Sequence, residues 1–134
     1  MSLAKPRANG ATMGSPVDAR AALCDALTAV PRLQVHPTMP SAPVAWDAWP
    51  RWAISNYTGG RLGWVAVHEY DVLVVLPAGY EPDTVDQGDA LLDQLALVLA
   101  LVGLVQQAEP VQLATPNGNP LPALRVRVIP HLNT

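Results

Sequence analysis

The best local cluster of reactive side chains in this chain is His68-Glu69-Tyr70-Asp71. General acid–base catalysis needs a base and its orienting group within hydrogen-bonding reach of each other. Neighbouring side chains of a strand point to opposite faces, so His68 shares one face with Tyr70 while Glu69 shares the other with Asp71. The sequence therefore predicts no His68–Asp71 catalytic pair. We expect the two carboxylates to lie on a solvated or inter-subunit face.

The remaining sequence predicts no catalytic, metal or cofactor site. The three histidines, His36, His68 and His131, have no metal-ligand spacing to each other or to Cys24. Cys24 is the only cysteine, which rules out an internal disulfide, and its helical setting is typical of a small apolar core residue. No Gly-x-Ser-x-Gly motif, phosphate-binding loop or dinucleotide fingerprint occurs. We predict a protein that is not an enzyme and has no cofactor.

Composition limits the classes of partner. The chain has 134 residues, of which 50% are hydrophobic and 14% charged, with a formal net charge of −3. This length is typical of one domain that buries a core of its own. No run of basic residues occurs, which argues against a dedicated DNA or RNA binder. A mildly acidic chain lets DNA pass without binding it, because phosphate contacts need lysine or arginine.

The most apolar segment is residues 95 to 105, an unbroken run of eleven residues. A helix that spans a bilayer needs about 20 apolar residues, so we expect a buried helix and no membrane association. No apolar leader sequence occurs near the N-terminus, so we expect no signal peptide.

Three tryptophans, Trp46, Trp49 and Trp52, stand three residues apart in a proline-rich segment. Aromatic side chains with few charges around them are typical of protein interfaces. Stacking on sugars or bases is the second interpretation, although base stacking favours interleaved basic residues and only Arg51 is present. The third interpretation is that the segment folds back and covers its own sheet. The sequence leaves these three alternatives open.

The order of predicted elements is helix, three strands, helix, two strands. Periodicity, capping residues and turn residues predict helices over 16–30 and from 83 or 84 to 102. They predict strands over 33–36, 51–55 and 64–77, and a hairpin of 110–115 with 123–132. Residues 37–50 are expected to form an extended loop or an edge segment, and residues 56–63 a turn. Ser15 is the expected N-cap of the first helix and Gly103 the expected C-cap of the second. Asn117-Gly118 marks the hairpin turn.

These elements predict an α+β domain over residues 14–134, with a single mixed, mainly antiparallel sheet and two helices packed on it. The second half of the 83–102 helix is apolar nearly all round, so we expect its own sheet, and a partner chain as well, to cover it. Residues 1–13 hold little that packs, and we expect a flexible arm that a partner orders.

The chain resembles the tail terminator proteins of long-tailed bacteriophages, the group of the minor tail protein U type. The resemblance is one of overall plan over about residues 15–132. It consists of the helix SPVDARAALCDALTAV, the strand RLQVHP, a proline-rich stretch, the strand WVAVHEYDVLVVLPAG, the helix TVDQGDALLDQLALVLALVG and the strand ALRVRVIP. This family has no sharp motif, and the tryptophan cluster corresponds to no family signature.

The resemblance implies a structural virion protein without catalysis. Such proteins form a homohexameric ring that caps the tail tube, stops its polymerisation and joins the tail to the neck proteins below the head. DNA passes through the ring, and the expected location is the tail–neck junction of the virion, with the host cytoplasm during assembly. The alternatives are another neck component, such as a head–tail connector or stopper, and a small ligand-binding domain that uses the tryptophan cluster and His68.

Seven residues are candidates for contacts with other subunits, or with the tube in the case of the tryptophans. Arg125 and Arg127 share one face of their strand, where they contact DNA phosphates or form salt bridges. The candidate interface residues are Trp46, Trp49, Trp52, Glu69, Asp71, Arg125 and Arg127.

Overall fold

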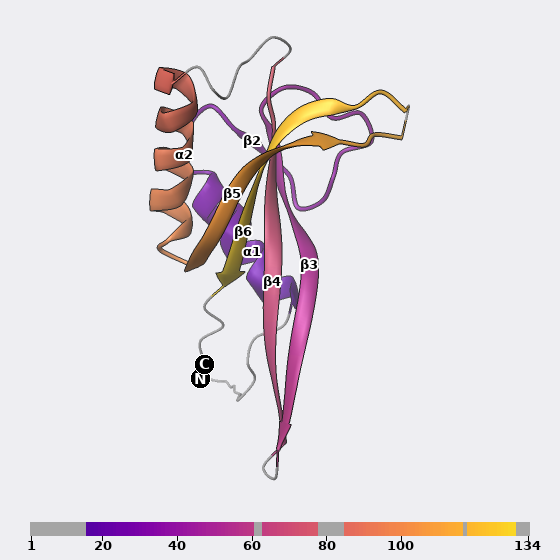
Figure 1. The fold of residues 1–134 in the computed structure, drawn as a ribbon, viewed down its shortest axis with the longest axis vertical. Coiled ribbons are helices and arrows are strands. Elements are labelled where there is room, and N and C mark those ends of the chain that lie inside the picture. Colours follow the sequence, from indigo (N-terminus) through magenta and orange to yellow (C-terminus); the bar gives the residue numbers. More distant parts are fainter. Residues whose placement is uncertain (1–15, 61–62, 78–84, 117, 131–134) are drawn as a thin grey trace, which may run out of the picture.

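The computed structural model describes residues 16–60, 63–77, 85–116 and 118–130. Within these ranges the chain forms one mixed sheet of five strands and two helices, which confirms the predicted α+β class and order of elements (Figure 1). The elements are α1 (Pro16–Leu27), β2 (Gln34–Val35), β3 (Asp47–Gly60), β4 (Gly63–Val75), α2 (Val85–Leu99), β5 (Gly103–Leu113) and β6 (Leu121–Pro130). The predicted arm of residues 1–13, the Ser15 cap and His131 lie outside the described residues.

The sheet has the strand order β2-β3-β4-β6-β5. The short strand β2 runs parallel to β3, and the other neighbouring pairs are antiparallel. Both helices cover one face: α1 contacts β3 and β6, α2 contacts β5, and the helices contact each other. We call the opposite side of the sheet the open face.

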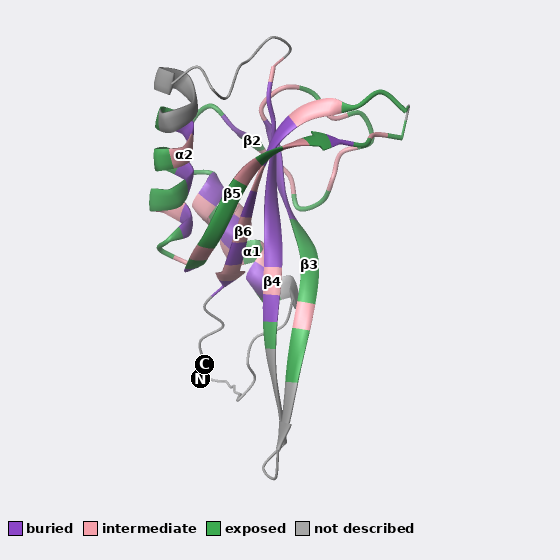
Figure 2. Ribbon diagram, viewed as in Figure 1, coloured by how far each residue is buried: buried purple, intermediate pink, exposed green. Residues whose placement is uncertain are grey.

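The main core lies between the helices and the sheet. Alternate residues of β4, namely Tyr70, Val72 and Val74, are fully buried and pack with Leu23 of α1 and Leu95 of α2 (Figure 2). Each such aliphatic side chain contributes roughly 1.5–3 kcal/mol when it is removed from water. The predicted division of β4 into two faces is therefore confirmed.

For residues 37–50, predicted as an extended loop or an edge segment, the second alternative is confirmed at the end of the range. Its last four residues already belong to β3, a strand of 14 residues. β2 pairs with Asp47 and Ala48 only, so Pro50 lies where β3 has β4 on one side and an open edge on the other. Sheets tolerate proline at such an edge, because no ladder hydrogen bond is lost there.

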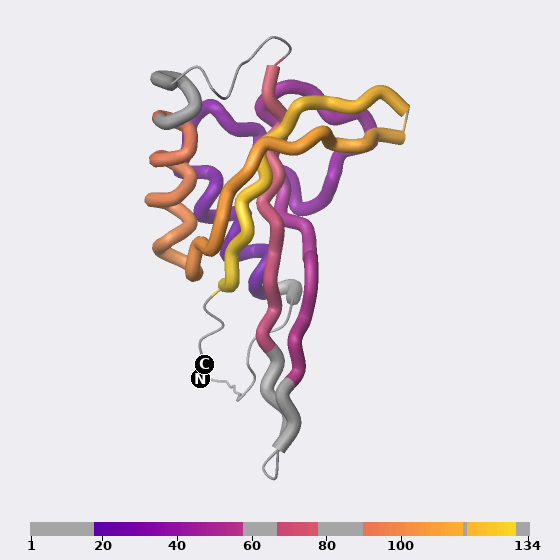
Figure 3. The backbone as a smooth tube through the Cα atoms, viewed as in Figure 1, coloured from indigo at the N-terminus to yellow at the C-terminus, as the bar shows by residue number. Residues whose placement is uncertain are grey.

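The predicted turn over residues 56–63 is only partly correct, because β3 and β4 are joined within this range but most of its residues belong to the strands. β3 and β4 remain paired as far as Gly60 and Gly63, whereas β6 pairs with β4 only from Tyr70 onward. Residues 54–60 and 63–69 therefore form a two-stranded ribbon without a third strand. Figures 1 and 3 show this ribbon running away from the rest of the sheet.

The second helix ends earlier than predicted, at Leu99, and Gly103 begins β5 instead of capping the helix. β5 starts seven residues before the predicted strand at 110. The Gly103 backbone packs so closely against β6 that a Cβ atom would stand 2.6 Å from the carbonyl oxygen of Ile129. The hairpin of β5 and β6 is confirmed, with Gly118 at a φ of 86° in its turn, while Asn117 lies outside the described residues.

Candidate interaction surface

The three tryptophans occupy three different environments. Trp49 is 1% exposed and packs on the open face with Leu73, Val75 and Leu113, in a small second core. Trp52 is 54% exposed. Trp49 thus belongs to the chain's own interior, whereas Trp52 is available to a partner.

Trp46 lies in the turn that leads into β3. Its φ of 71° lies in the left-handed region, which costs a non-glycine residue roughly 1–2 kcal/mol. The conformation is held by backbone hydrogen bonds: Trp46 N donates to Val75 O at 2.7 Å, and Gln34 N donates to Trp46 O at 2.9 Å. The Arg32 guanidinium lies 4.7 Å from the centre of the Trp46 ring, which favours a cation–π interaction. Trp46 also packs against the main core.

The loop before β3 is held by a residue that the sequence did not single out. Asp47 is 3% exposed, and its carboxylate contacts His36 Nε2 at 2.9 Å and accepts a hydrogen bond from Val44 N at 2.9 Å. In the sequence, the position of Asp47 between Trp46 and Trp49 could have indicated it. The His36–Asp47 pair joins the end of β2 to the start of β3, which is a structural role.

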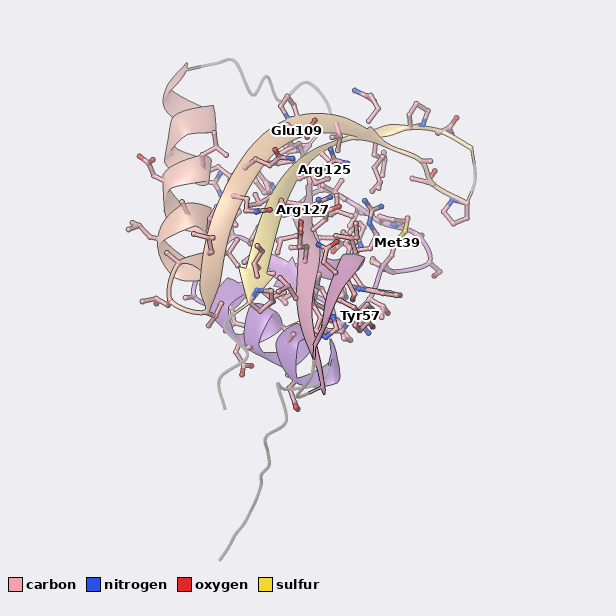
Figure 4. All side chains as sticks on the ribbon, turned by 60° about the horizontal axis from the view of Figure 1, so that its bottom comes forward. Met39, Tyr57, Glu109, Arg125 and Arg127 are labelled. Carbon is pink, nitrogen blue, oxygen red and sulfur yellow. The ribbon has the colours of Figure 1, made fainter. Side chains whose placement is uncertain are left out.

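The four charged candidates form ion pairs across the open face. Arg127 donates from Nε to Asp71 Oδ1 at 2.6 Å and from Nη1 to Glu69 Oε1 at 3.3 Å. Arg125 donates to Glu109 of β5 at 2.6 Å (Figure 4). Each of the four charges therefore has an opposite charge within its own chain.

The expectation of a solvated carboxylate pair is wrong for Asp71, which is 1% exposed. Arg51 approaches Asp71 as well, with Nη2 3.3 Å from Oδ2. Burial alone raises the pKa of the Asp71 carboxyl, but the hydrogen bonds from Arg127 and Arg51 outweigh it and leave the pKa below its ordinary value. The hydrogen bond to Asp71 raises the pKa of Arg127 in turn, so both groups are charged at neutral pH.

His68 lies on the helix-covered face, away from Asp71, as predicted. Its Nδ1 is 2.6 Å from the hydroxyl of Ser55, which also accepts a hydrogen bond from Trp52 Nε1 at 2.8 Å. The Tyr57 ring stands edge-on to the imidazole at 6.5 Å between centroids. The hydroxyl lies between two ring nitrogens, so this cluster fastens β3 to β4 at the root of the ribbon.

The prediction that Cys24 is a small core residue is only partly correct, because Cys24 is not among the buried core residues. It is half-buried in α1, and burial raises the pKa of its thiol, which disfavours the reactive thiolate. Its Sγ lies 3.6 Å from His36 O, beside a cavity of about 430 Å³ between α1 and β2. Among the described residues, no group of three or more histidine, cysteine or acidic side chains is placed to hold a metal ion.

Two apolar surfaces stand out at opposite edges of the sheet. The first, here called the ribbon patch, lies on β3 and β4 at and beyond the root of the ribbon and consists of Trp52, Ile54, Tyr57 and Val67. The second, here called the corner patch, lies where α2 turns into β5 and consists of Leu97, Leu101 and Leu104. Leu97 is 72% and Leu101 80% exposed. The sheet covers only one side of α2, so the expectation that a partner chain covers the other side stays a prediction.

No protein-family model matches the chain, and no curated protein sequence matches it. Neither helix, over the residues that the structure describes, is long and apolar enough to cross a membrane.

Proposed function

We propose that this protein is a structural subunit of a ring, of the tail terminator kind, that caps the tail tube of a long-tailed bacteriophage. In this role it ends tube polymerisation and joins the tail to the neck. The observation that carries the proposal is the pair of exposed apolar surfaces at opposite edges of one sheet, the ribbon patch and the corner patch.

A two-stranded ribbon is marginally stable by itself in water. Here the ribbon exposes apolar side chains on both sides, because Trp52 and Tyr57 point to the helix-covered face while Ile54 and Val67 point to the open face. Exposed apolar side chains on both faces of such a ribbon favour contact with another protein. A subunit that needs a neighbour at each edge suits a ring.

The open face suits a channel through which DNA moves. Its arginines, Arg51, Arg125 and Arg127, each contact a carboxylate of the same chain. A phosphate group competes with these carboxylates for the same donors, so binding to DNA is disfavoured. These ion pairs favour passage of DNA without sequence-specific contacts.

A cavity favours the ligand-binding alternative. A hollow of about 280 Å³ at the β3 edge is lined by Trp49, Trp52, Arg20 and Arg51 among others. The Nε atom of Arg20 is buried and has no hydrogen-bond partner among the described residues. A small anion with an apolar body matches this lining. Quenching of tryptophan fluorescence by such a ligand, lost in Arg20→Met, would favour this second function.

The experiment that tests the proposal is negative-stain electron microscopy of lysates from the phage without this gene. Overlong tails that lack heads are expected, and supplying the intact gene from a plasmid should restore tails of normal length. Tails of normal length beside filled heads that fail to join would make the protein a neck connector. Intact virions would overturn the structural role.

A further inference from the structure

One side of β3 is unpaired along most of its length (Figure 1). β2 pairs with β3 at Asp47 and Ala48 only, and in the described part of the chain no other strand lies on that side. The backbone bonds from β2 end on the carbonyl oxygens of Trp46 and Ala48. Because backbone groups point to alternate sides along a strand, Trp52 presents its N–H and C=O to the same side. An open strand edge of this kind is a template for pairing with another chain.

The unpaired side of β3 begins at an apolar hollow. The hollow has a volume of about 280 Å³, and its apolar lining residues are Met39, Trp49, Pro50, Trp52, Leu73 and Leu113. Pockets for small molecules usually measure about 300–1,000 Å³. This smaller hollow therefore suits a single large apolar side chain.

Arg20 of α1 supplies a cation at the same place. Its side chain lines the hollow, and its Nε is buried without a hydrogen-bond partner among the described residues. The ion pairs of the described residues do not include Arg20. Arg51 also lines the hollow, but it belongs to the charge-balanced cluster with Asp71, Arg127 and Glu69. Arg20 is therefore the donor that lacks an acceptor, and a carboxylate is the acceptor that matches a guanidinium.

We propose that the β3 edge binds the C-terminal end of a partner protein as an added strand. The terminal carboxylate lies on Arg20, the last side chain fills the hollow, and the preceding residues pair with β3 from Trp52 onward. β3 runs from this hollow toward the tip of the ribbon, so the added strand is antiparallel to it. Strand addition with capture of a chain end is a known mode of peptide recognition. The proposal rests on the ligand-binding alternative for this hollow, not on the ring, and names its occupant.

A small carboxylate is the competing occupant. It contacts Arg20 and the hollow, but it leaves the backbone edge of β3 and the exposed side chains beside it uncovered. These side chains lie on both faces of the ribbon, with Trp52 and Tyr57 on one face and Ile54 on the other. Successive side chains of an added strand also point to alternate faces, so a strand covers both sets. The apolar surface along the edge therefore favours the strand.

Fluorescence polarisation of a labelled peptide tests the proposal with the purified protein. The probe is a hexapeptide of alternating threonine and valine that ends in leucine, with fluorescein on its N-terminus and a free C-terminal carboxylate. Amidation of the C-terminus should weaken binding about tenfold or more, because a hydrogen-bonded charge is lost. Replacing the last leucine by glycine should weaken it by a similar factor, because the hollow is left empty.

Arg20→Met should weaken binding of the free peptide as strongly as amidation does. Arg32→Met is the matched control, because Arg32 lies over the Trp46 ring and outside the hollow. It should leave the affinity unchanged. Circular dichroism spectra that match the parent would show that both variants fold.

Amide hydrogen exchange measured by NMR tests the added strand itself. Peptide binding should slow exchange of the Trp52 amide, which faces the unpaired side of β3, and should leave the amides of β5 unchanged. Equal affinity of the amidated peptide, or a bound peptide that leaves the Trp52 amide unprotected, would overturn the proposal. Hexanoate that binds as tightly as the peptide would keep the ligand-binding alternative and overturn the strand. Binding of neither probe would overturn both, while tail length in the deletion phage tests the ring separately.

Discussion

Arg127 and Asp71 face each other across the β4–β6 pair, and Arg127 Nε donates to Asp71 Oδ1 at 2.6 Å on the open face of the sheet. Arg51 reaches the other carboxylate oxygen from β3. One buried carboxylate therefore links the three central strands, at the level where the ribbon leaves the sheet. The position of the ribbon depends on this link.

Replacing Asp71 by asparagine should destabilise the fold strongly. The change leaves the Arg127 guanidinium partly buried without its main counter-charge, and breaking a buried pair costs about 3 kcal/mol. Chemical denaturation followed by circular dichroism measures the free energy of unfolding. Glu109→Gln is the control, because the Arg125–Glu109 pair is more exposed and is expected to contribute about 0–1 kcal/mol. Equal losses in both variants would contradict the central role of Asp71.

The same carboxylate should make stability depend on acid pH. Its folded pKa lies below the ordinary value of 3.8, so its contribution is fully present above that value and is lost as the pH falls through the folded pKa. Unfolding free energies measured between about pH 6 and pH 2 should therefore fall more steeply in the parent than in Asp71→Asn. Parallel pH curves for the two proteins would refute this assignment.

Trp49 and Trp52 should respond differently to alanine substitution. Trp49→Ala empties a site in the open-face core and should cost about 3–5 kcal/mol of stability. Trp52→Ala removes a half-exposed ring and should leave stability within about 1 kcal/mol while weakening self-association. Thermal unfolding and sedimentation velocity separate the two effects. Loss of assembly by a folded Trp49→Ala chain, with none in Trp52→Ala, would reverse these roles.

Replacing Ser55 by alanine tests the root of the ribbon. The substitution removes the partner of both His68 Nδ1 and Trp52 Nε1. Of these two side chains only His68 is buried, and an unpaired buried group costs about 1–3 kcal/mol. Faster amide hydrogen exchange should be confined to the paired residues of β3 and β4 near His68. Ser41→Ala, at an exposed position before β3, is the control and should leave exchange unchanged. Uniformly faster exchange throughout the sheet would mean that Ser55 supports the global fold instead.

The sequence predicted the fold class because alternation in β4 and in β6 is strong and unambiguous. Tyr70, Val72 and Val74 belong to one core and Leu73 and Val75 to the other, as the alternation indicates. The prediction left residues 47–50 open between a loop and an edge segment, and it failed for residues 56–60, because proline and glycine are typical of loops. These residues are strand because their pairing with β4 continues past Tyr70, and pairing between distant segments is not visible in local composition.

The candidate surface was only partly predictable for the same physical reason. Three tryptophans at equal spacing looked alike in sequence, yet Trp49 and Trp52 point to opposite faces of β3 and differ completely in burial. For the corner patch, the sequence predicted a helix whose second half is apolar nearly all round and is covered by a partner. Its exposed part includes Leu101 and Leu104, because the helix ends at Leu99 and the chain turns there into β5.

The turn between α2 and β5 depends on the absence of a side chain at Gly103. A Cβ there would stand 2.6 Å from the Ile129 carbonyl oxygen and 2.9 Å from the Pro130 Cα, and backbone atoms at these distances cannot move aside easily. Gly103→Ala should therefore destabilise the fold by about 2–3 kcal/mol or more.

Gly118→Ala is the matched control, because it changes a glycine of the β5–β6 turn that has a positive φ and no atom within 4 Å of the added Cβ. Its cost is backbone strain alone, about 1 kcal/mol. Chemical denaturation should place Gly103→Ala clearly below Gly118→Ala in stability. Since Gly103 lies between Leu101 of the turn and Leu104 of β5, Gly103→Ala should also weaken self-association under conditions in which the chain remains folded, whereas Gly118→Ala should not. A larger loss for Gly118→Ala would show that β6 yields at the close contact and that the turn is not fixed by Gly103.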